Sequence, residues 1–273
     1  MQSLGNDFVV IDGVRQALQL TPAIAATLAD RRLGIGCDQI LVAEAPIDPD
    51  VDFAFRIFNT DGSESAQCGN GARCFAWFLR RQGLTLADDI RVETHSTRMN
   101  LHLLNDGRVR VDMGAPIFEP ARIPFDATDN DGTHRLEANG ETRDFDVLSM
   151  GNPHAVTIVD DLTEVDVQGI GYAIERHPRF PERTNVGFLQ FVDRGAIALR
   201  VFERGVGETQ ACGSGACAAV VSGRRRGLLD RDVVVALPGG RVEVSWKENG
   251  APVSLTGDAV HVFNGEIEIS ENS

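Results

Sequence analysis

Two short blocks of the chain place a cysteine before the same pattern of small residues. They are Cys68–Ala72, which reads Cys-Gly-Asn-Gly-Ala, and Cys212–Ala216, which reads Cys-Gly-Ser-Gly-Ala. Each block follows a strand-like segment and precedes an apolar stretch that ends in arginines and then glycine, which are signals for the end of a helix. We therefore expect Cys68 and Cys212 at or just before helix N-termini, where free N–H groups and the helix dipole lower the pKa of a thiol.

A thiol in such a position can act as a base or a nucleophile, and the exposed amides beside it can bind a carboxylate. Two such thiols that face one ligand from opposite sides suit the inversion of a carbon acid. One thiolate removes the α-proton and the other thiol delivers a proton to the opposite face. The two helix termini stabilise the charge that spreads into the carboxylate.

Other chemistries fit the residues less well. Cys37, Cys74 and Cys217 complete no zinc-type spacing with the first two cysteines, so we predict no metal and interpret these three as core residues. Pyridoxal phosphate enzymes hold their cofactor on a lysine, and the one lysine, Lys247, lies in a hairpin-tip sequence. The sequence therefore predicts chemistry without a cofactor.

The two cysteine blocks belong to a longer internal repeat. Residues 68–84 and 212–228 are identical at 8 of 17 positions without a gap, at an offset of 144. The register continues outside this block, because Gly5-Asn6 corresponds to Gly151-Asn152 at an offset of 146. We interpret residues 5–114 and 150–257 as two structural repeats.

Each repeat has a mixed α and β pattern. Strands are predicted at residues 8–12, 53–58, 155–159 and 198–202, and hairpin turns at 105–107 and 248–250. Residues 115–149 are expected to hold one or two edge strands, and residues 260–269 have a strand-like pattern. These elements predict an N-terminal domain at 1–114, completed by 258–273, and a C-terminal domain at 115–257.

Polar residues gather in the loops that should surround the cysteines. His154 occupies the second-repeat counterpart of the loop at residues 6–8, and Glu203-Arg204 ends the strand that leads to Cys212. Amides at paired positions could bind the amines and carboxylates of a small zwitterion. They are Asn6, Gln39, Asn59, Asn70, Asn152 and Asn185.

Charge and hydropathy exclude several classes of protein. The chain has 273 residues, with 40 acidic against 26 basic side chains and a net charge of −14. It lacks the basic footprint of a nucleic-acid-binding protein, and an anionic membrane would repel it. No apolar run approaches the ~20 residues of a membrane span, and the N-terminus is unlike a secretory signal. We therefore expect a cytoplasmic protein with reduced thiols.

The chain resembles the diaminopimelate epimerase family from residue 4 to its C-terminal region, and both cysteine motifs are highly specific. The resemblance rests on Leu4–Phe8, Gly36–Gln39, Phe58–Gly62, Cys68–Cys74, Gly151–His154, Thr184–Val186, Glu203–Gly205 and Ala211–Cys217.

This resemblance implies an α/β (α+β) fold of two pseudo-symmetric domains, each a mixed β-sheet wrapped around a central helix, with the active site in the cleft between them. It implies a cofactor-independent isomerase that interconverts LL- and meso-2,6-diaminopimelate for lysine and peptidoglycan synthesis, with a homodimer as an option. Cys68 and Cys212 match the acid/base cysteines, and His154 and Glu203 match residues that assist them. The matching substrate contacts are Asn6, Gln39, Asn59, Gly69, Asn70, Asn152, Asn185, Glu203, Arg204, Gly213 and Ser214.

Two alternatives remain open from the sequence, a proline-type racemase and a redox sensor, whereas the presence of both thiols argues against a phenazine-type isomerase. A proline-type racemase would use paired cysteines but would not need Arg204 and the distal amides. Isomerases of the phenazine type lack the two thiols. A redox sensor would use Cys68 and Cys212 as a reversible disulfide.

Overall fold

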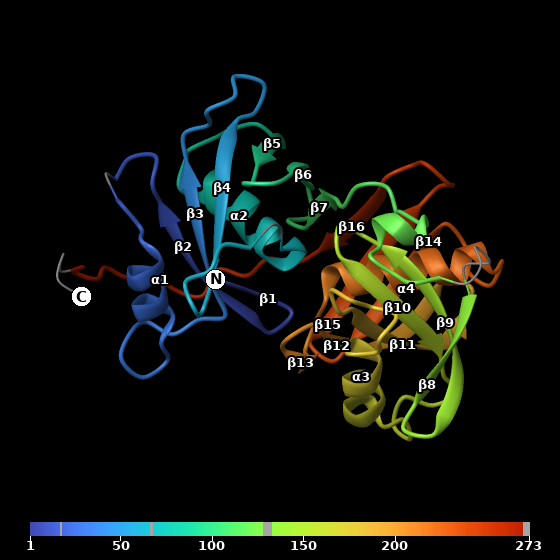
Figure 1. Cartoon of the computed structure of the whole chain (residues 1–273). Coiled ribbons are helices and arrows are strands. Elements are labelled where there is room, and N and C mark those ends of the chain that lie inside the picture. The colour runs from blue at the N-terminus through green and yellow to red at the C-terminus, as the bar shows by residue number, and fades with distance from the viewer. Residues whose placement is uncertain (17, 66–67, 128–132, 270–273) are drawn as a thin grey trace. The chain divides into compact units, whose positions relative to one another are not determined.

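The computed structural model describes residues 1–16, 18–65, 68–127 and 133–269, and the chain divides into two units (Figure 1). Unit 1 comprises Met1–Val111 and Thr256–Ser273, and unit 2 comprises Asp112–Leu255. Residues 270–273, which the sequence analysis places in the first domain, lie outside the described part, as do residues 128–132 of the segment expected to hold edge strands.

Unit 1 is a mixed sheet whose neighbouring strands follow in chain order from β1 to β7. β2 and β3 are parallel, β4 is antiparallel to β3, and β5 is parallel to β4. β5, β6 and β7 then form an antiparallel meander. Its elements are β1 (Gln2–Ser3), β2 (Asn6–Asp12), α1 (Pro22–Ala29), β3 (Gln39–Glu44), β4 (Phe53–Asn59), α2 (Gly69–Arg81), β5 (Asp89–Glu93), β6 (Arg98–Leu103) and β7 (Val109–Asp112).

In unit 2 the strands are again of mixed direction and follow the order β16-β15-β14-β12-β11-β10-β9-β8, and β13 pairs with β12. The hairpin of β8 and β9 lies in the segment where edge strands are expected, and β8 forms an edge. The elements are a 3-10 helix η1 (Pro120–Arg122), β8 (Thr133–Ala138), β9 (Glu141–Ser149), β10 (Pro153–Ile158), α3 (Val167–Glu175), β11 (Asn185–Asp193), β12 (Ala196–Glu203), β13 (Gly207–Thr209), α4 (Gly213–Arg225), β14 (Asp232–Leu237), β15 (Gly240–Trp246) and β16 (Val253–Gly257).

The strand registers confirm the internal duplication. In unit 1, Phe8 of β2 pairs with Gln39 of the parallel strand β3. In unit 2, His154 of β10 pairs with Asn185 of the parallel strand β11, and both residues stand 146 positions later. β12 is antiparallel to β11 and parallel to β14, as β4 is antiparallel to β3 and parallel to β5. The two repeats therefore share one topology, as the sequence predicts.

A central helix lies inside each sheet. α2 contacts β1, β2 and β3 near one end of its sheet and β6 near the other, and 10 of its 13 residues are buried. α4 contacts β9, β10, β11, β12 and β15, and 9 of its 13 residues are buried. Cys74 and Cys217 are fully buried on these helices, and Cys37 is buried beside α1, so all three are core residues as predicted.

Both central helices begin directly after the predicted cysteines, which occupy the N-cap positions. Gly71 and Gly215 allow the first turn of each helix to pack closely against the cysteine side chain and the neighbouring strand. A Cβ on Gly71 would lie 3.2 Å from Leu41 and 3.3 Å from the Cys68 sulfur, and a Cβ on Gly215 would lie 3.0 Å from Val201 and 3.3 Å from the Cys212 sulfur. Since these distances are tighter than ordinary contacts, a Cβ at either glycine would require the thiol or the neighbouring side chain to shift.

The parallel pairs β2/β3 and β10/β11 require crossover connections, which the short helices α1 and α3 provide. Thr21 caps α1 by accepting the Ile24 N–H at 3.3 Å, and Asp166 caps α3 by accepting the Gly169 N–H at 2.9 Å. α1 packs on Ile40, Val42 and other apolar residues of unit 1, and α3 packs on the core of unit 2. Each of these sheet regions thus has a helix on both faces.

One sequence prediction fails at the C-terminal segment. Residues 260–269 form no strand among the described residues, where Val260 makes a single bridge to Gln2 with two N···O distances of 2.9 Å. The physical reason is that β1, the available partner, is two residues long and cannot continue a ladder.

Among the described residues, no helix is long and apolar enough to cross a membrane.

Arg73 is a fully buried cation on α2. Its guanidinium donates to Ser3 Oγ at 2.7 Å, Asn70 Oδ1 at 2.9 Å and the Asp258 carbonyl at 3.3 Å. We expect Arg73→Met to lower the free energy of unfolding by about 3 kcal/mol, because buried acceptors lose a charged donor. Urea titration measures the loss, and Arg81→Met on the exposed end of α2 should cost less than about 0.5 kcal/mol. Equal losses of unfolding free energy in the two variants would show that the hydrogen bonds of Arg73 do not stabilise the fold.

Candidate active site

In unit 1, three predicted contact residues, Asn6, Gln39 and Asn59, lie at the edge of the sheet that is formed by the ends of its strands. β2 and β3 begin at this edge and β4 ends there, so Gln39 pairs in register with both Phe8 and Asn59. The Gln39 side-chain amide donates to Asn59 Oδ1 at 2.9 Å. Asn6 donates its amide to Asp38 Oδ2 at 2.7 Å. The hydrogen bonds of Gln39 and Asn6 use their amide nitrogens, whereas Asn59 engages both ends of its amide, because it also donates to Ser63 Oγ at 3.0 Å.

A charged cluster holds the two loops that carry Asn6 and Gln39. Arg31 donates to both oxygens of Asp7, at 2.9 and 2.7 Å, and to Asp38 at 2.8 Å. The backbone N–H of Asp38 donates to Asp7 Oδ1 at 2.8 Å, and the Asp7 N–H donates to Asp38 Oδ2 at 3.1 Å. The Arg31 guanidinium holds the pKa of Asp7 below its ordinary value. Sequence reasoning missed this cluster, although both acids adjoin predicted amides.

Cys68 caps α2 and is half-buried. Its sulfur accepts the Gly71 N–H at 3.2 Å. The thiol therefore lies beside the backbone N–H groups of the first helical turn, which have no hydrogen-bond acceptor within the helix. Asn70 Oδ1 accepts a hydrogen bond from Arg73 at 2.9 Å, which fixes the orientation of the Asn70 amide. Arg73 lies inside the cysteine motif, which is the signal that sequence analysis did not use.

In unit 2, the equivalent sheet edge carries His154, Asn185 and Glu203. β10 and β11 begin there and β12 ends there. Asn185 is buried and donates its amide to the Pro153 carbonyl at 2.9 Å, while its Oδ1 accepts the Arg204 N–H at 3.0 Å. Asn185 therefore acts as a brace between two site loops, with both ends of its amide engaged.

His154 is fully buried, with Nε2 3.0 Å from Asn152 Oδ1 and 3.1 Å from Ser214 Oγ. The Asn152 oxygen is an acceptor, so it favours the proton on Nε2 and a lone pair on Nδ1. Nδ1 is buried and has no hydrogen-bond partner in the described part of the chain. Burial, reinforced by the charge of Arg204, lowers the pKa of His154 to about 3, which keeps the ring neutral.

Cys212 is buried at the N-cap of α4, with its sulfur 3.7 Å from Ser214 Oγ. Burial and the nearby negative charge of Glu203 raise the pKa of the Cys212 thiol well above its ordinary value. Burial also raises the pKa of Glu203, which accepts hydrogen bonds from the Thr209 hydroxyl at 2.6 Å and from the Cys212 thiol. Glu203, and not His154, is thus the titratable side chain in contact with Cys212, a pairing that the sequence left undecided.

The lowered pKa of His154 predicts that the free energy of unfolding depends on pH. Because its pKa falls from 6.5 in the unfolded chain to about 3 in the folded protein, only the unfolded chain gains a proton between these values. Stability is therefore full above about pH 6.5 and falls as the pH drops, by about 1.4 kcal/mol between pH 7.5 and 5.5. Urea titrations should show that His154→Gln removes this loss and that His95→Gln, at an exposed position, retains it. The same pH dependence in wild type and His154→Gln would contradict the burial argument.

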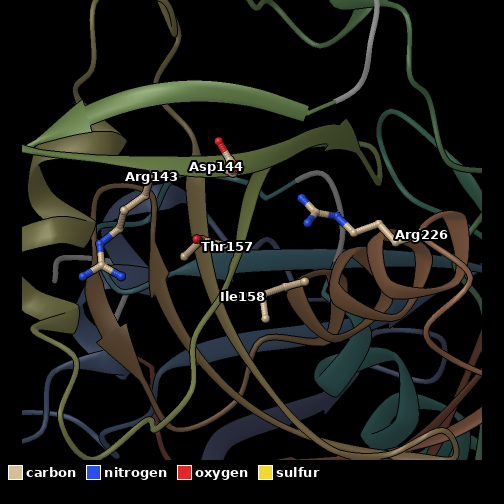
Figure 2. Close-up of a pocket in the computed structure, with 5 residues that line it drawn as sticks. All are labelled: Arg143, Asp144, Thr157, Ile158 and Arg226. Atoms are coloured by element: carbon tan, nitrogen blue, oxygen red, sulfur yellow. The ribbon is translucent and has the colours of Figure 1, made fainter.

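A pocket of about 270 Å³ lies elsewhere in unit 2 (Figure 2). It is lined by Arg143, Asp144, Thr157, Ile158 and Arg226. Arg226 follows the C-terminus of α4, whereas Cys212 precedes its N-terminus. The pocket contains none of the predicted site residues.

Solved structures share this fold. A protein described as a predicted epimerase from Pseudomonas aeruginosa matches with a TM-score of 0.68 at 19% identity, covering 97% of this chain and 94% of that chain. A hydroxyproline epimerase from Agrobacterium vitis matches with a TM-score of 0.67 at 18% identity, covering 94% and 87%. A phenazine biosynthesis protein of the PhzF family from Bacillus anthracis matches with a TM-score of 0.64 at 16% identity, covering 98% and 95%.

The fold and the family evidence together define an enzyme of the racemase and epimerase kind. The model of the diaminopimelate epimerase family matches residues 1–119 and 147–262. The chain therefore belongs to the diaminopimelate epimerase family, as its motifs predict.

Proposed function

We propose that this protein interconverts LL- and meso-2,6-diaminopimelate by two-base chemistry that uses Cys68 and Cys212. The observation that carries the proposal is the pair of equivalent central helices, each with a cysteine at its N-cap position. The family match supports the same substrate.

In the proposed reaction, a thiolate removes the α-proton of one amino acid end of the substrate. The C–H electron pair moves into the adjacent carboxylate, which the N–H groups of the helix termini stabilise. The second thiol then delivers its proton to the opposite face of the α carbon and becomes the thiolate. One proton enters and one leaves, so the step is balanced without a cofactor.

The two thiols begin in different protonation states in this proposal. Cys212 is the resting thiol, because it is buried beside Glu203 and its pKa is raised. Cys68 is the resting thiolate, because it is less buried and its sulfur accepts an N–H at a helix terminus. Glu203 takes the Cys212 proton when the reaction runs in the other direction.

The remaining predicted residues bind and orient the substrate. We assign to Arg204 the carboxylate of the distal amino acid end, which is not inverted, because guanidinium pairs well with carboxylate. His154 Nε2 lies 3.0 Å from Asn152 Oδ1 and 3.1 Å from Ser214 Oγ, so the neutral ring orients these two side chains at the start of α4. The other proposed contacts are Asn6, Gln39, Asn59, Gly69, Asn70, Asn152, Asn185, Gly213 and Ser214.

A substrate panel tests the proposal. Reduced protein is incubated separately with LL-diaminopimelate, L-proline and trans-4-hydroxy-L-proline, and the stereoisomers are separated by chiral chromatography. The proposal predicts meso-diaminopimelate from the first substrate and no D-proline or epimerised hydroxyproline from the others. Turnover of a proline substrate alone would assign the protein to the proline-type activity instead.

A further inference from the structure

We propose that Glu175 is a positioning residue that holds Arg204 in place for recognition of the distal end of the substrate. This inference rests on the proposed function, since it concerns how the assigned Arg204 acts. No motif of the sequence singles out Glu175, and the structure alone draws attention to it.

Glu175 occupies a place that stability alone does not favour. It is the last residue of α3, and its side chain is 1% exposed. A carboxylate at a helix C-terminus faces the negative end of the helix dipole, and its burial removes it from water. A buried acid in such a place requires compensating partners, and those partners show what it does.

The partners of Glu175 are two arginines and one backbone N–H. Arg176 contacts Oε2, and the Arg183 guanidinium lies 3.6 Å from Oε1. Both arginines are partly exposed, so they balance the charge from the solvent side. Oε1 also accepts the N–H of Gly205 at 2.7 Å. The carboxylate therefore connects α3 to the loop after β12.

That loop is fixed at two consecutive residues. The Gly205 N–H is held by Glu175 from α3, and the Arg204 N–H is held by Asn185 from β11 at 3.0 Å. Gly205 has a φ of +77°, and its neighbour Val206 closes a turn onto the Glu203 carbonyl at 3.1 Å. The side chain of Arg204 thus leaves a backbone that Glu175 and Asn185 clamp together. Losing the Glu175 bond should free this backbone and misdirect the guanidinium.

Variants at position 175 separate the hydrogen bond from the charge. Glu175→Ala removes both, Glu175→Asp keeps the charge but is too short to reach Gly205, and Glu175→Gln keeps an acceptor without the charge. Glu164→Ala, an exposed acid ahead of α3, is the matched control. Hydrogen exchange by mass spectrometry of a peptide covering residues 203–209 reports on the loop without any substrate.

We expect amide exchange in this peptide to speed up at least about tenfold in Glu175→Ala and Glu175→Asp, and to stay near wild type in Glu175→Gln and Glu164→Ala. KM for LL-diaminopimelate should rise about tenfold in the first two variants, with a much smaller change in kcat. In an Arg204→Met background, Glu175→Asp should add no further increase in KM, because both changes remove the same contact.

Three results would overturn the inference. They are unchanged exchange in Glu175→Asp, equal effects of Glu175→Gln and Glu175→Ala, or a KM effect that is fully additive with Arg204→Met. The last two would assign Glu175 a structural role in charge balance. Wild-type protein that does not turn over diaminopimelate would refute the proposed function instead, and the exchange experiment would still decide whether Glu175 holds the loop.

Discussion

Cys212→Ser should reduce the rate of epimerisation by about 10³-fold or more in both directions. A serine hydroxyl ionises far less readily than a thiol, so it can neither protonate the carbanion efficiently nor return as a base. Because the forward and reverse reactions share one transition state, LL and meso substrates should lose rate equally. Coupled or chromatographic assays of both substrates measure the effect, and Cys68→Ser should give a loss of the same order.

Cys217→Ala is the matched control for this experiment. Cys217 lies on α4 as well, but it is fully buried in the core and has no place in the proposed chemistry. This variant should keep most of the wild-type rate, which excludes a general effect of removing a thiol from the helix. A Cys212→Ser protein that is folded and retains more than a tenth of the wild-type rate would remove Cys212 from the mechanism.

Glu203→Gln should reduce kcat by about 10²-fold or more and should also change its pH profile. In the wild type, the carboxylate form of Glu203 serves Cys212, and burial raises the pKa of Glu203 above its ordinary value. The rate should therefore fall as the pH drops through this raised pKa, because Glu203 becomes protonated. The variant has no titrating group at this position, so the corresponding acidic limb should vanish.

Thr209→Val provides a graded test of the same idea. The Thr209 hydroxyl donates to Glu203 at 2.6 Å and favours the charged carboxylate, so its loss should raise the pKa of Glu203 further. The acidic limb should move to higher pH, while the rate at the plateau changes little. An acidic limb that stays in place in both Glu203→Gln and Thr209→Val would show that another group controls it.

Sequence alone predicts the parts of the site that the duplication repeats. Cys68 and Cys212 are predictable as N-cap residues because each helix is bounded by local signals. The glycine-rich cysteine block marks its beginning, and arginines followed by glycine mark its end. The offset of 146 predicts that His154 and Asn185 occupy the places of Phe8 and Gln39, and the strand registers agree. The topology can therefore be predicted because the same local patterns, each weak when taken singly, occur twice in the same order.

Other features depend on long-range contacts that no local pattern encodes. α1 and α3 are short, and their capping residues carry weak signals, so they were not predicted although the parallel strands require them. The contact of Glu203 with Cys212 depends on how β12 meets α4. The strand predicted at residues 260–269 has the right alternation but finds almost no partner strand. In each case the outcome depends on tertiary neighbours.

Proton NMR in D2O tests two-base inversion most directly. Reduced protein is mixed with LL-diaminopimelate, and both isomers are followed from the first turnover. With two bases, we expect meso-diaminopimelate to carry deuterium at its inverted α carbon while the remaining LL substrate initially keeps its α-protons, because separate groups remove and deliver the proton. Deuterium that enters the LL substrate as fast as the meso product would contradict two bases, and no meso product from fully reduced protein would contradict the proposed activity.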